Sequence, residues 1–198
     1  MFFSKVYFKC LSIADRYLLS VINYIKLKSN SVKYKSFPKI SGLLVVRNRG
    51  KIEIGEEVLL TSRLYSNPVG GRNQCCLFTT KKGQIIIGNK VGISNAVIFS
   101  TCKIEIEDNV LIGGGVQIFD TDFHSTNYSE RIKLSKDMDV KSSPVLIKKG
   151  AFIGANAMIL KGVVIGEKSI VASGAVVSKE IPDGEIWGGN PARFIKNN

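Results

Sequence analysis

The chain has 198 residues, of which 44% are hydrophobic and 22% charged, and its net charge is +12. These values suit one globular domain with a sizeable core. No stretch reaches the roughly 18 apolar residues that span a bilayer, which excludes a transmembrane helix. The basic residues are spread along the chain without a nucleic-acid-binding motif, so no nucleic-acid partner is expected.

Residues 1–36 are predicted to form an amphipathic helix followed by a basic linker. Apolar residues recur there at helical spacing, with lysine and arginine between them. Asp15 and Arg16 interrupt the apolar run, which argues against a secretory signal. We expect the helix to pack on the domain that follows, in its own or a neighbouring subunit. The alternative is peripheral contact with a membrane, where basic and aromatic residues are useful.

The remaining residues, 37–198, are dominated by a period of six. Counting in sixes lands on an aliphatic residue six times in succession, and four residues after each of the first five comes a small or slim side chain. Neither a helix nor an ordinary strand holds such a phase, whereas a parallel β-helix turns every sixth side chain inward. The aliphatic positions are Ile147, Ile153, Ile159, Ile165, Val171 and Val177, and the slim ones are Ala151, Ala157, Val163, Ser169 and Ala175.

The same rhythm is present earlier, less regularly. Ile87, Ile93 and Phe99 form one predicted inward run, and Ile106, Ile112 and Ile118 form another after a one-residue slip placed at Thr101 to Lys103. Glycine follows many inward residues, where we expect a coil corner with positive φ. Those glycines are Gly55, Gly88, Gly113, Gly154 and Gly166.

Two breaks interrupt the rhythm, one near residues 65–76 and a longer one spanning residues 119–144. The longer break contains His124, the only histidine in the chain. Repeat proteins tend to place function on insertions that project from the scaffold. His124 is therefore the leading candidate for a functional residue.

Two segments carry a resemblance to a known family. The run NVLIGGGVQIFDTDFH, from Asn109 to His124, and the run IWGGNPARFIK, from Ile186 to Lys196, resemble segments of the hexapeptide-repeat acyltransferases, in particular of small bacterial sugar and polysaccharide O-acetyltransferases. The resemblance covers roughly residues 43–196. It implies a left-handed β-helix of triangular cross-section, assembled as a homotrimer with active sites between subunits.

The resemblance also implies a catalytic set. His124 corresponds to the base that takes a proton from the acceptor, a role that suits neutral imidazole. Asp122 or Asp120 would hold the imidazole tautomer, with a backbone carbonyl as the alternative. Asn95 matches an asparagine that lines the family's active site. The alternative for Asn95 is a coil-corner residue that tolerates left-handed backbone.

Acetyl-CoA is the donor that the resemblance implies. Gly154 and Ala155 match positions that hold the thioester carbonyl, where a backbone N–H would stabilise the oxyanion. The sequence departs from the family here, because Phe152 replaces a tryptophan and Ala155 a serine. Further contacts with the pantetheine arm and adenosine are expected from Ser173, Gly174, Ser178 and Lys179.

The segment 182–198 is predicted to close the CoA site. Asn190 suits a helix N-cap and Pro191 the first helical position, so a strand leading into a short terminal helix is expected. Arg193 and Lys196 would then share a helix face and clamp the CoA phosphates.

The function that follows is acetyl transfer from acetyl-CoA to a hydroxyl of a saccharide or lipid-linked saccharide, in capsule, O-antigen or exopolysaccharide assembly. The alternatives are N-acetylation of an amino group on a nucleotide sugar and a catalytically silent β-helix scaffold. A zinc carbonic anhydrase needs three histidines, and the chain has one, so no metal is predicted. The cysteine spacing suits a reduced compartment, so we expect a cytoplasmic protein, or one at the inner face of the cytoplasmic membrane.

Overall fold

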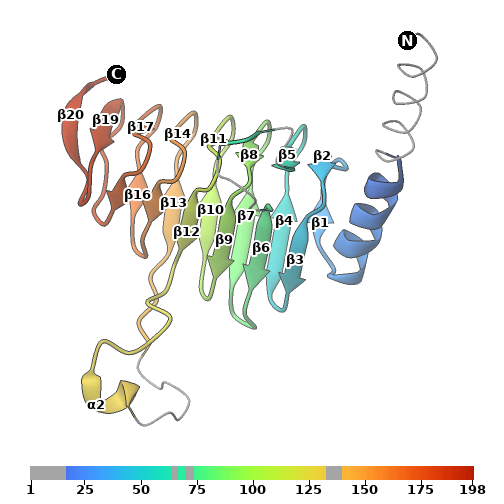
Figure 1. Cartoon of the computed structure of the whole chain (residues 1–198), viewed down its shortest axis with the longest axis horizontal. Coiled ribbons are helices and arrows are strands. Elements are labelled where there is room, and N and C mark those ends of the chain that lie inside the picture. The colour runs from blue at the N-terminus through green and yellow to red at the C-terminus, as the bar shows by residue number, and fades with distance from the viewer. Residues whose placement is uncertain (1–16, 64–66, 70–73, 133–139) are drawn as a thin grey trace.

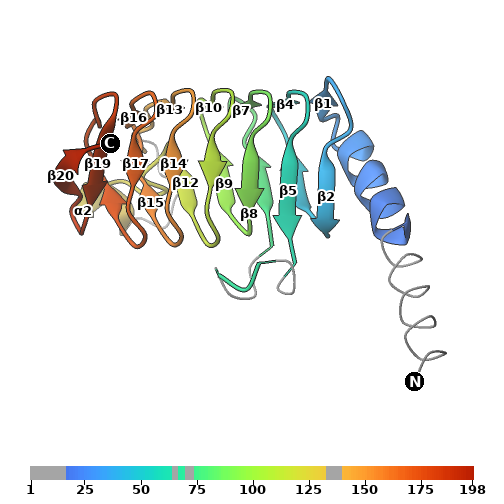
Figure 2. The same cartoon turned by 90° about the horizontal axis from the view of Figure 1, so that it is seen from above.

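The computed structural model describes residues 17–63, 67–69, 74–132 and 140–198, and it is a left-handed parallel β-helix (Figures 1 and 2). Three sheets form its sides, as the resemblance implies, and their strands are parallel except for β20. Side A consists of β1 (Lys33–Tyr34), β4 (Lys51–Ile54), β7 (Gln84–Ile87), β10 (Ile104–Ile106), β13 (Val145–Ile147) and β16 (Val164–Ile165).

Side B consists of β2 (Lys39–Gly42), β5 (Leu59–Ser62), β8 (Gly92–Ser94), β11 (Leu111–Ile112), β14 (Phe152–Ile153), β17 (Ile170–Val171), β19 (Glu185–Gly188) and β20 (Arg193–Asn197). Side C consists of β3 (Val45–Asn48), β6 (Cys76–Thr79), β9 (Val97–Ser100), β12 (Gln117–Phe119), β15 (Met158–Ile159) and β18 (Val176–Val177). The chain turns at three corners, A–B, B–C and C–A.

The core is a column of stacked aliphatic side chains, and its C-terminal half follows the predicted register. All six aliphatic positions from Ile147 to Val177, and all five slim positions between them, are buried. Burying one such isoleucine contributes on the order of 1.5–3 kcal/mol. Since every coil adds the same kind of layer, the column stabilises the whole length of the domain.

The prediction for Phe99 is wrong. Phe99 is half-exposed on the outer face of β9, and Ile98 is the buried residue. The B–C corner between Ile93 and Ala96 is one residue shorter than the period requires. The C–A corner that contains Thr101 to Lys103 is two residues longer, so the net slip of one residue is the difference between these two changes. Asn95 turns the shortened B–C corner with φ of 44°.

The glycine prediction is also wrong in its reason. Residues with positive φ come later in the corners, and only some of them are glycine. Gly154 is instead required by close approach, since a Cβ there would lie 2.5 Å from the Ser173 nitrogen of the next coil. Six of the corner residues with positive φ are Glu57, Lys90, Asn109, Gly115, Asn156 and Lys168.

An N-terminal helix, described over residues 17–29, covers one end of the β-helix beside β1 and β2 (Figure 2). Asn23 fixes it there: its side-chain Nδ2 donates to the Gly42 carbonyl at 2.8 Å, and its Oδ1 accepts from the Leu44 N–H at 3.0 Å. Leu27 is fully buried. The helix thus packs on its own domain, while β1 lies inside the segment predicted as linker. Among the described residues, no helix is long and apolar enough to cross a membrane.

Candidate active site

The predicted functional loop leaves the β-helix at the C–A corner, between β12 and β13 (Figure 1). Its stem is a short antiparallel ribbon in which Thr121 faces Ser142 and the Asp122 N–H donates to the Lys141 carbonyl at 3.1 Å. Beyond the stem, the loop carries the short helix α2 (Tyr128–Arg131). Residues 133–139 of the predicted loop lie outside the described residues.

Asp120 anchors this stem to the neighbouring coil. Its carboxylate is fully buried and accepts four hydrogen bonds, from the Ser100 hydroxyl at 2.6 Å, the Thr101 N–H at 2.7 Å, the Thr101 hydroxyl at 2.9 Å and the Cys102 N–H at 2.9 Å. A carboxylate has about four lone-pair sites, so these bonds saturate it. Asp120 is therefore structural and is not available to orient His124.

His124 lies just beyond the stem, with its side chain exposed to solvent. Its main-chain N–H donates to the Asp122 carbonyl at 2.7 Å. The preceding Phe123 has φ of 63° and packs against Phe99 and Phe119, with ring centroids 5.1 and 5.0 Å apart. This packing of Phe123 holds the backbone next to His124 in place. The Asp122 carboxylate forms an ion pair with Lys161 at 2.7 Å.

Asn95 lies at the B–C corner, fully buried, and its Nδ2 donates to the Asn67 carbonyl at 2.9 Å. Its Oδ1 is buried without a hydrogen-bond partner among the described residues. The width of side C separates this corner from the one that carries His124, a distance on the order of 10 Å at about 3.3 Å per strand residue. One copy of the chain therefore does not bring Asn95 and His124 together.

The residues predicted to hold the thioester occupy the same B–C corner as Asn95. The Gly154 N–H donates to the Val171 carbonyl of the next coil at 2.7 Å, and the Ala155 carbonyl accepts from the Gly174 N–H at 2.8 Å. Among the described residues, the Ala155 N–H donates no backbone hydrogen bond. Of the two predicted oxyanion donors, Ala155 is thus the one with a free donor. Ser173 and Gly174 are exposed at this corner, whereas Ser178 and Lys179 are exposed near the C–A corner.

The predicted terminal helix is wrong. Residues 185–197 form an antiparallel hairpin of β19 and β20, which turns through a cis Asn190–Pro191 peptide bond. Asn190 therefore caps no helix, and Pro191 occupies a turn. The end of the chain adds strands to side B because β19 pairs in parallel with β17.

Arg193 and Lys196 nevertheless share one face. Arg193 pairs with Gly188 and Lys196 with Ile186, while a bulge in the hairpin takes up the extra residue. Gly188 and Ile186 are two residues apart on β19, so paired side chains at these positions point to the same side of the sheet. Both cations are exposed. The bulge therefore places Arg193 and Lys196 on one face, as the predicted helix would have done.

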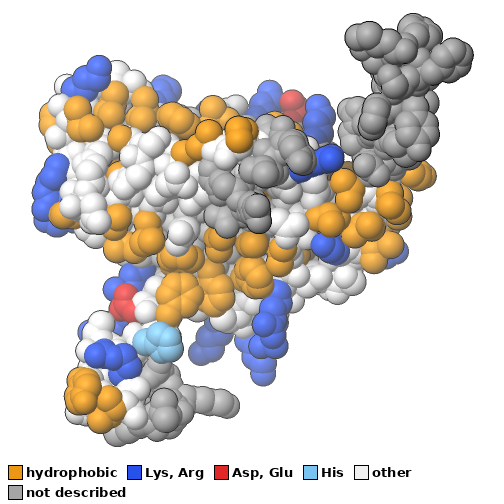
Figure 3. Space-filling view, viewed as in Figure 1, with side chains coloured by type: hydrophobic (Ala, Val, Ile, Leu, Met, Phe, Trp, Pro, Cys, Tyr) orange, Lys and Arg blue, Asp and Glu red, His pale blue; other side chains and the backbone are white. Residues whose placement is uncertain are grey.

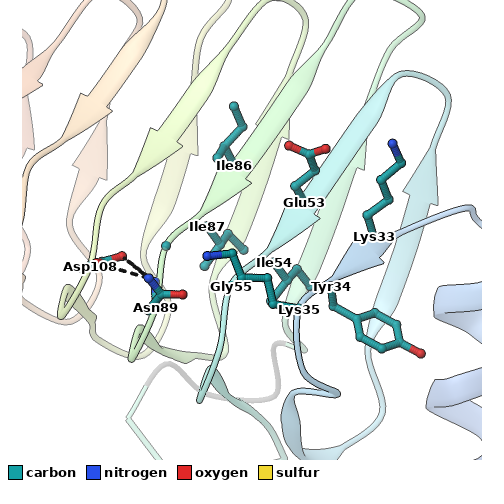
Figure 4. A pocket seen from close by; sticks show the side chains of 11 residues that line it. Lys33, Tyr34, Lys35, Glu53, Ile54, Gly55, Ile86, Ile87, Asn89 and Asp108 are labelled. Carbon is teal, nitrogen blue, oxygen red and sulfur yellow. Dashed lines mark hydrogen bonds between the residues drawn. The ribbon is translucent and has the colours of Figure 1, made fainter.

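A hollow of about 480 Å³ lies elsewhere, over side A and the A–B corner (Figure 4). It contains none of the predicted site residues. Lys33 and Lys35 line it together with Glu53 and Asp108. The Asn89 N–H donates to the Asp108 carboxylate at 2.6 Å, and this bond lowers the pKa of Asp108. The hollow is thus a gap between stacked corners whose charges offset one another.

Comparisons with known proteins agree with this architecture. The family model described as bacterial transferase hexapeptide (six repeats) matches residues 144–179. A hexapeptide-repeat-containing acetyltransferase of Vibrio cholerae, solved with acetyl coenzyme A, is 31% identical, and the match covers 63% of this chain and 68% of that one with a TM-score of 0.52. The chain belongs to the hexapeptide-repeat acyltransferases.

Other members of the family are similar in structure. A point mutant of AntD, an N-acyltransferase of Bacillus cereus solved with dTDP and coenzyme A, is 25% identical over 84% of each chain, with a TM-score of 0.66. A galactoside acetyltransferase solved with coenzyme A is 25% identical over 78% of this chain and 66% of that one, with a TM-score of 0.57.

One protein of similar sequence is named as a carbonic anhydrase. Gamma carbonic anhydrase 1 of Arabidopsis thaliana mitochondria is 35% identical over 111 residues, and the match spans 56% of this chain but 26% of that protein. The hexapeptide-repeat chain has one histidine. It therefore lacks the three histidines that hold zinc in a carbonic anhydrase.

Sequence reasoning missed two features of the site. Lys161, the partner of Asp122, comes from the C–A corner of the coil after the loop. Once the hexad phase is assigned, the corners of successive coils are known to be neighbours, so the ion pair between Asp122 and Lys161 could have been predicted from the sequence. Ser100 and Thr101, which hold Asp120, lie at the same corner of the coil before the loop.

Proposed function

We propose that the protein transfers an acetyl group from acetyl-CoA to a hydroxyl of a saccharide, with His124 as general base. The observation that carries this proposal is the exposed His124 on a loop whose stem is pinned to a hexapeptide-repeat β-helix. The similarity to an acetyltransferase solved with acetyl coenzyme A and to a galactoside acetyltransferase supports the donor and the acceptor class.

In the proposed reaction, the neutral imidazole of His124 takes the proton from the acceptor hydroxyl as its oxygen attacks the thioester carbonyl carbon. The carbonyl π electrons move to the oxygen, and the N–H of Ala155 would stabilise that oxyanion. When the tetrahedral intermediate collapses, the carbon–sulfur bond breaks and the imidazolium returns the proton to the CoA sulfur. Asp122, paired with Lys161, is the carboxylate that remains to orient His124.

Assembly as a homotrimer completes this site. The donor corner, with Asn95 and Ala155, and the base loop, with His124, border side C on opposite edges of one chain. A base loop of one subunit lying against the donor corner of its neighbour would bring the two halves together. CoA would then lie between subunits, with Arg193 and Lys196 of the hairpin near its phosphates.

N-acylation is the second candidate, because the similarity to the N-acyltransferase AntD covers 84% of each chain. His124 would take a proton from an amine instead of a hydroxyl, and the rest of the chemistry is the same. The two products differ in stability, since an acetyl ester is cleaved by mild base and an amide is not. That difference separates the candidates in one experiment.

The test is release of free CoA thiol from acetyl-CoA by the purified protein, with a panel of saccharides and amino sugars as acceptors. His124→Ala should lower acceptor-dependent release by roughly a hundredfold or more, as for a lost general base. Calorimetric CoA binding should be unchanged in this variant, which serves as the control for folding. Full activity of His124→Ala refutes the base, and absence of both release and CoA binding favours a silent scaffold.

A further inference from the structure

A second hollow, of about 440 Å³, lies on side C and the C–A corner. It is lined by Arg47 and Arg49 at the end of β3, by Lys81 and Lys82 after β6, and by Phe78 and Phe99. All four basic side chains are exposed. Figure 3 shows lysine and arginine side chains gathered there, beside apolar side chains and the loop that carries the pale-blue histidine.

No carboxylate among the described residues compensates the positive charge of this hollow. Its remaining lining residues are threonines, and none of the four basic side chains forms an ion pair with a described carboxylate. Elsewhere on the surface, Lys51 pairs with Glu53 and Lys103 with Glu105. Four like charges around one cavity repel one another, and an anion bound between them relieves that repulsion.

The hollow also adjoins the base loop. Thr101, which lines it, donates its hydroxyl to Asp120 in the stem and lies 2.8 Å from the Ser142 hydroxyl. Phe78 and Phe99 lie 6.5 Å apart, and Phe99 in turn contacts Phe123, next to His124. These aromatic rings form an apolar surface that extends from the basic residues to the loop that carries His124.

The position favours the acceptor over the donor. The hollow is formed by coils that precede the loop, whereas Ala155, Gly174, Arg193 and the other expected CoA contacts belong to coils that follow it. Two substrates reaching His124 from its two sides would account for both sets of residues.

We propose that this hollow binds the anionic group of an acidic acceptor, a saccharide that carries a phosphate or a carboxylate. Arg47 and Arg49 suit paired hydrogen bonds to either group, and Lys81 and Lys82 add compact charge. The sugar ring packs on Phe99, and its hydroxyl faces His124. This inference rests on the proposed acetyl transfer for its catalytic meaning, but anion binding is testable without it.

The test uses three probes that share one sugar ring: glucose 1-phosphate, glucuronate and glucose. Their binding to the full chain is measured by calorimetry, for wild type, for Lys81→Gln/Lys82→Gln and for Arg47→Gln/Arg49→Gln. The matched control is Lys149→Gln/Lys168→Gln, which removes two exposed charges from the A–B corner. Circular dichroism melting confirms that each variant is folded.

We expect the two anionic probes, or one of them, to bind more tightly than glucose, and added salt to weaken that binding. Each site variant should lower the anionic affinity roughly tenfold or more, while the control stays at the wild-type value. Equal binding of glucose and both anions, or equal losses in the control, overturns the proposal. Weaker CoA binding in the site variants, with anion binding unchanged, would assign the hollow to the donor instead.

The outcome is separable from that of the proposed function. Selective anion binding together with the absence of both acetyl transfer and CoA binding leaves the anion site standing and refutes the transferase. Acetyl transfer to neutral saccharides that is unaffected by either site variant does the reverse.

Discussion

Asp120→Asn should destabilise the protein far more than the same change at its near neighbour Asp122. In Asp120, one carboxylate oxygen accepts from the Thr101 N–H and hydroxyl, and the other from the Ser100 hydroxyl and the Cys102 N–H. Asparagine replaces one of these oxygens with an NH₂ group, which donates and cannot accept. Two donors that face this buried carboxylate then lose their acceptor, at about 1–3 kcal/mol each, so the expected cost is about 2–6 kcal/mol.

Asp122→Asn removes one ion pair, with Lys161, between side chains that are 25% and 30% exposed. Such a pair contributes on the order of 0.2–1 kcal/mol. Urea unfolding followed by circular dichroism, at one fixed protein concentration, gives both free energies from the midpoint and slope. A loss below about 1 kcal/mol for Asp120→Asn, or equal losses for both variants, would refute the idea that Asp120 anchors the loop.

Two further predictions concern the packing and the surface. Gly154→Ala should lower the free energy of unfolding by about 3 kcal/mol or more, because its Cβ would lie 2.5 Å from the Ser173 nitrogen. Gly174→Ala, at a position with φ of 72° and open space around it, should lower the free energy of unfolding by about 1–2 kcal/mol in the same urea assay. Similar losses for the two variants would contradict the close approach at Gly154. The outer face of the N-terminal helix exposes Leu18, Val21 and Ile25 by 58%, 40% and 57%, and we expect it to contact anionic lipid. Replacing these three residues with glutamine should abolish flotation with phosphatidylglycerol vesicles, and wild-type protein that stays with the unbound fraction would argue for a protein neighbour on this face.

The hexad period predicted a parallel β-helix because every sixth side chain points into its interior, whereas the triangular cross-section was implied by the family resemblance. The period failed at Phe99, where both Ile98 and Phe99 are large and apolar and composition alone does not say which points inward. The structure resolves this at Asn95, since the corner there has one residue fewer between Ile93 and Ala96. A slip in a repeat is invisible where the residues on both sides of it are apolar.

The closing segment shows a different limit. Asn190 and Pro191 satisfy the local rules for a helix start, and those rules predict a helix. The chain instead forms a hairpin, because β19 continues the stack of side B on β17 and offers its other edge to β20. Pairing with an open sheet edge is a tertiary effect that outweighs a local capping preference.

The two aspartates beside His124 show what separates a structural from a functional carboxylate in a repeat fold. In the sequence, Asp120 and Asp122 are equivalent candidates, each within four residues of the histidine. Their roles diverge because Asp120 still belongs to the last residues of the coil, where the preceding coil supplies donors at regular spacing, while Asp122 lies in the stem and meets a single lysine. The scaffold thus saturates the Asp120 carboxylate, whereas the stem leaves Asp122 with one partner. His124 lies beyond the stem, out of register with the coils, which leaves its imidazole exposed for chemistry.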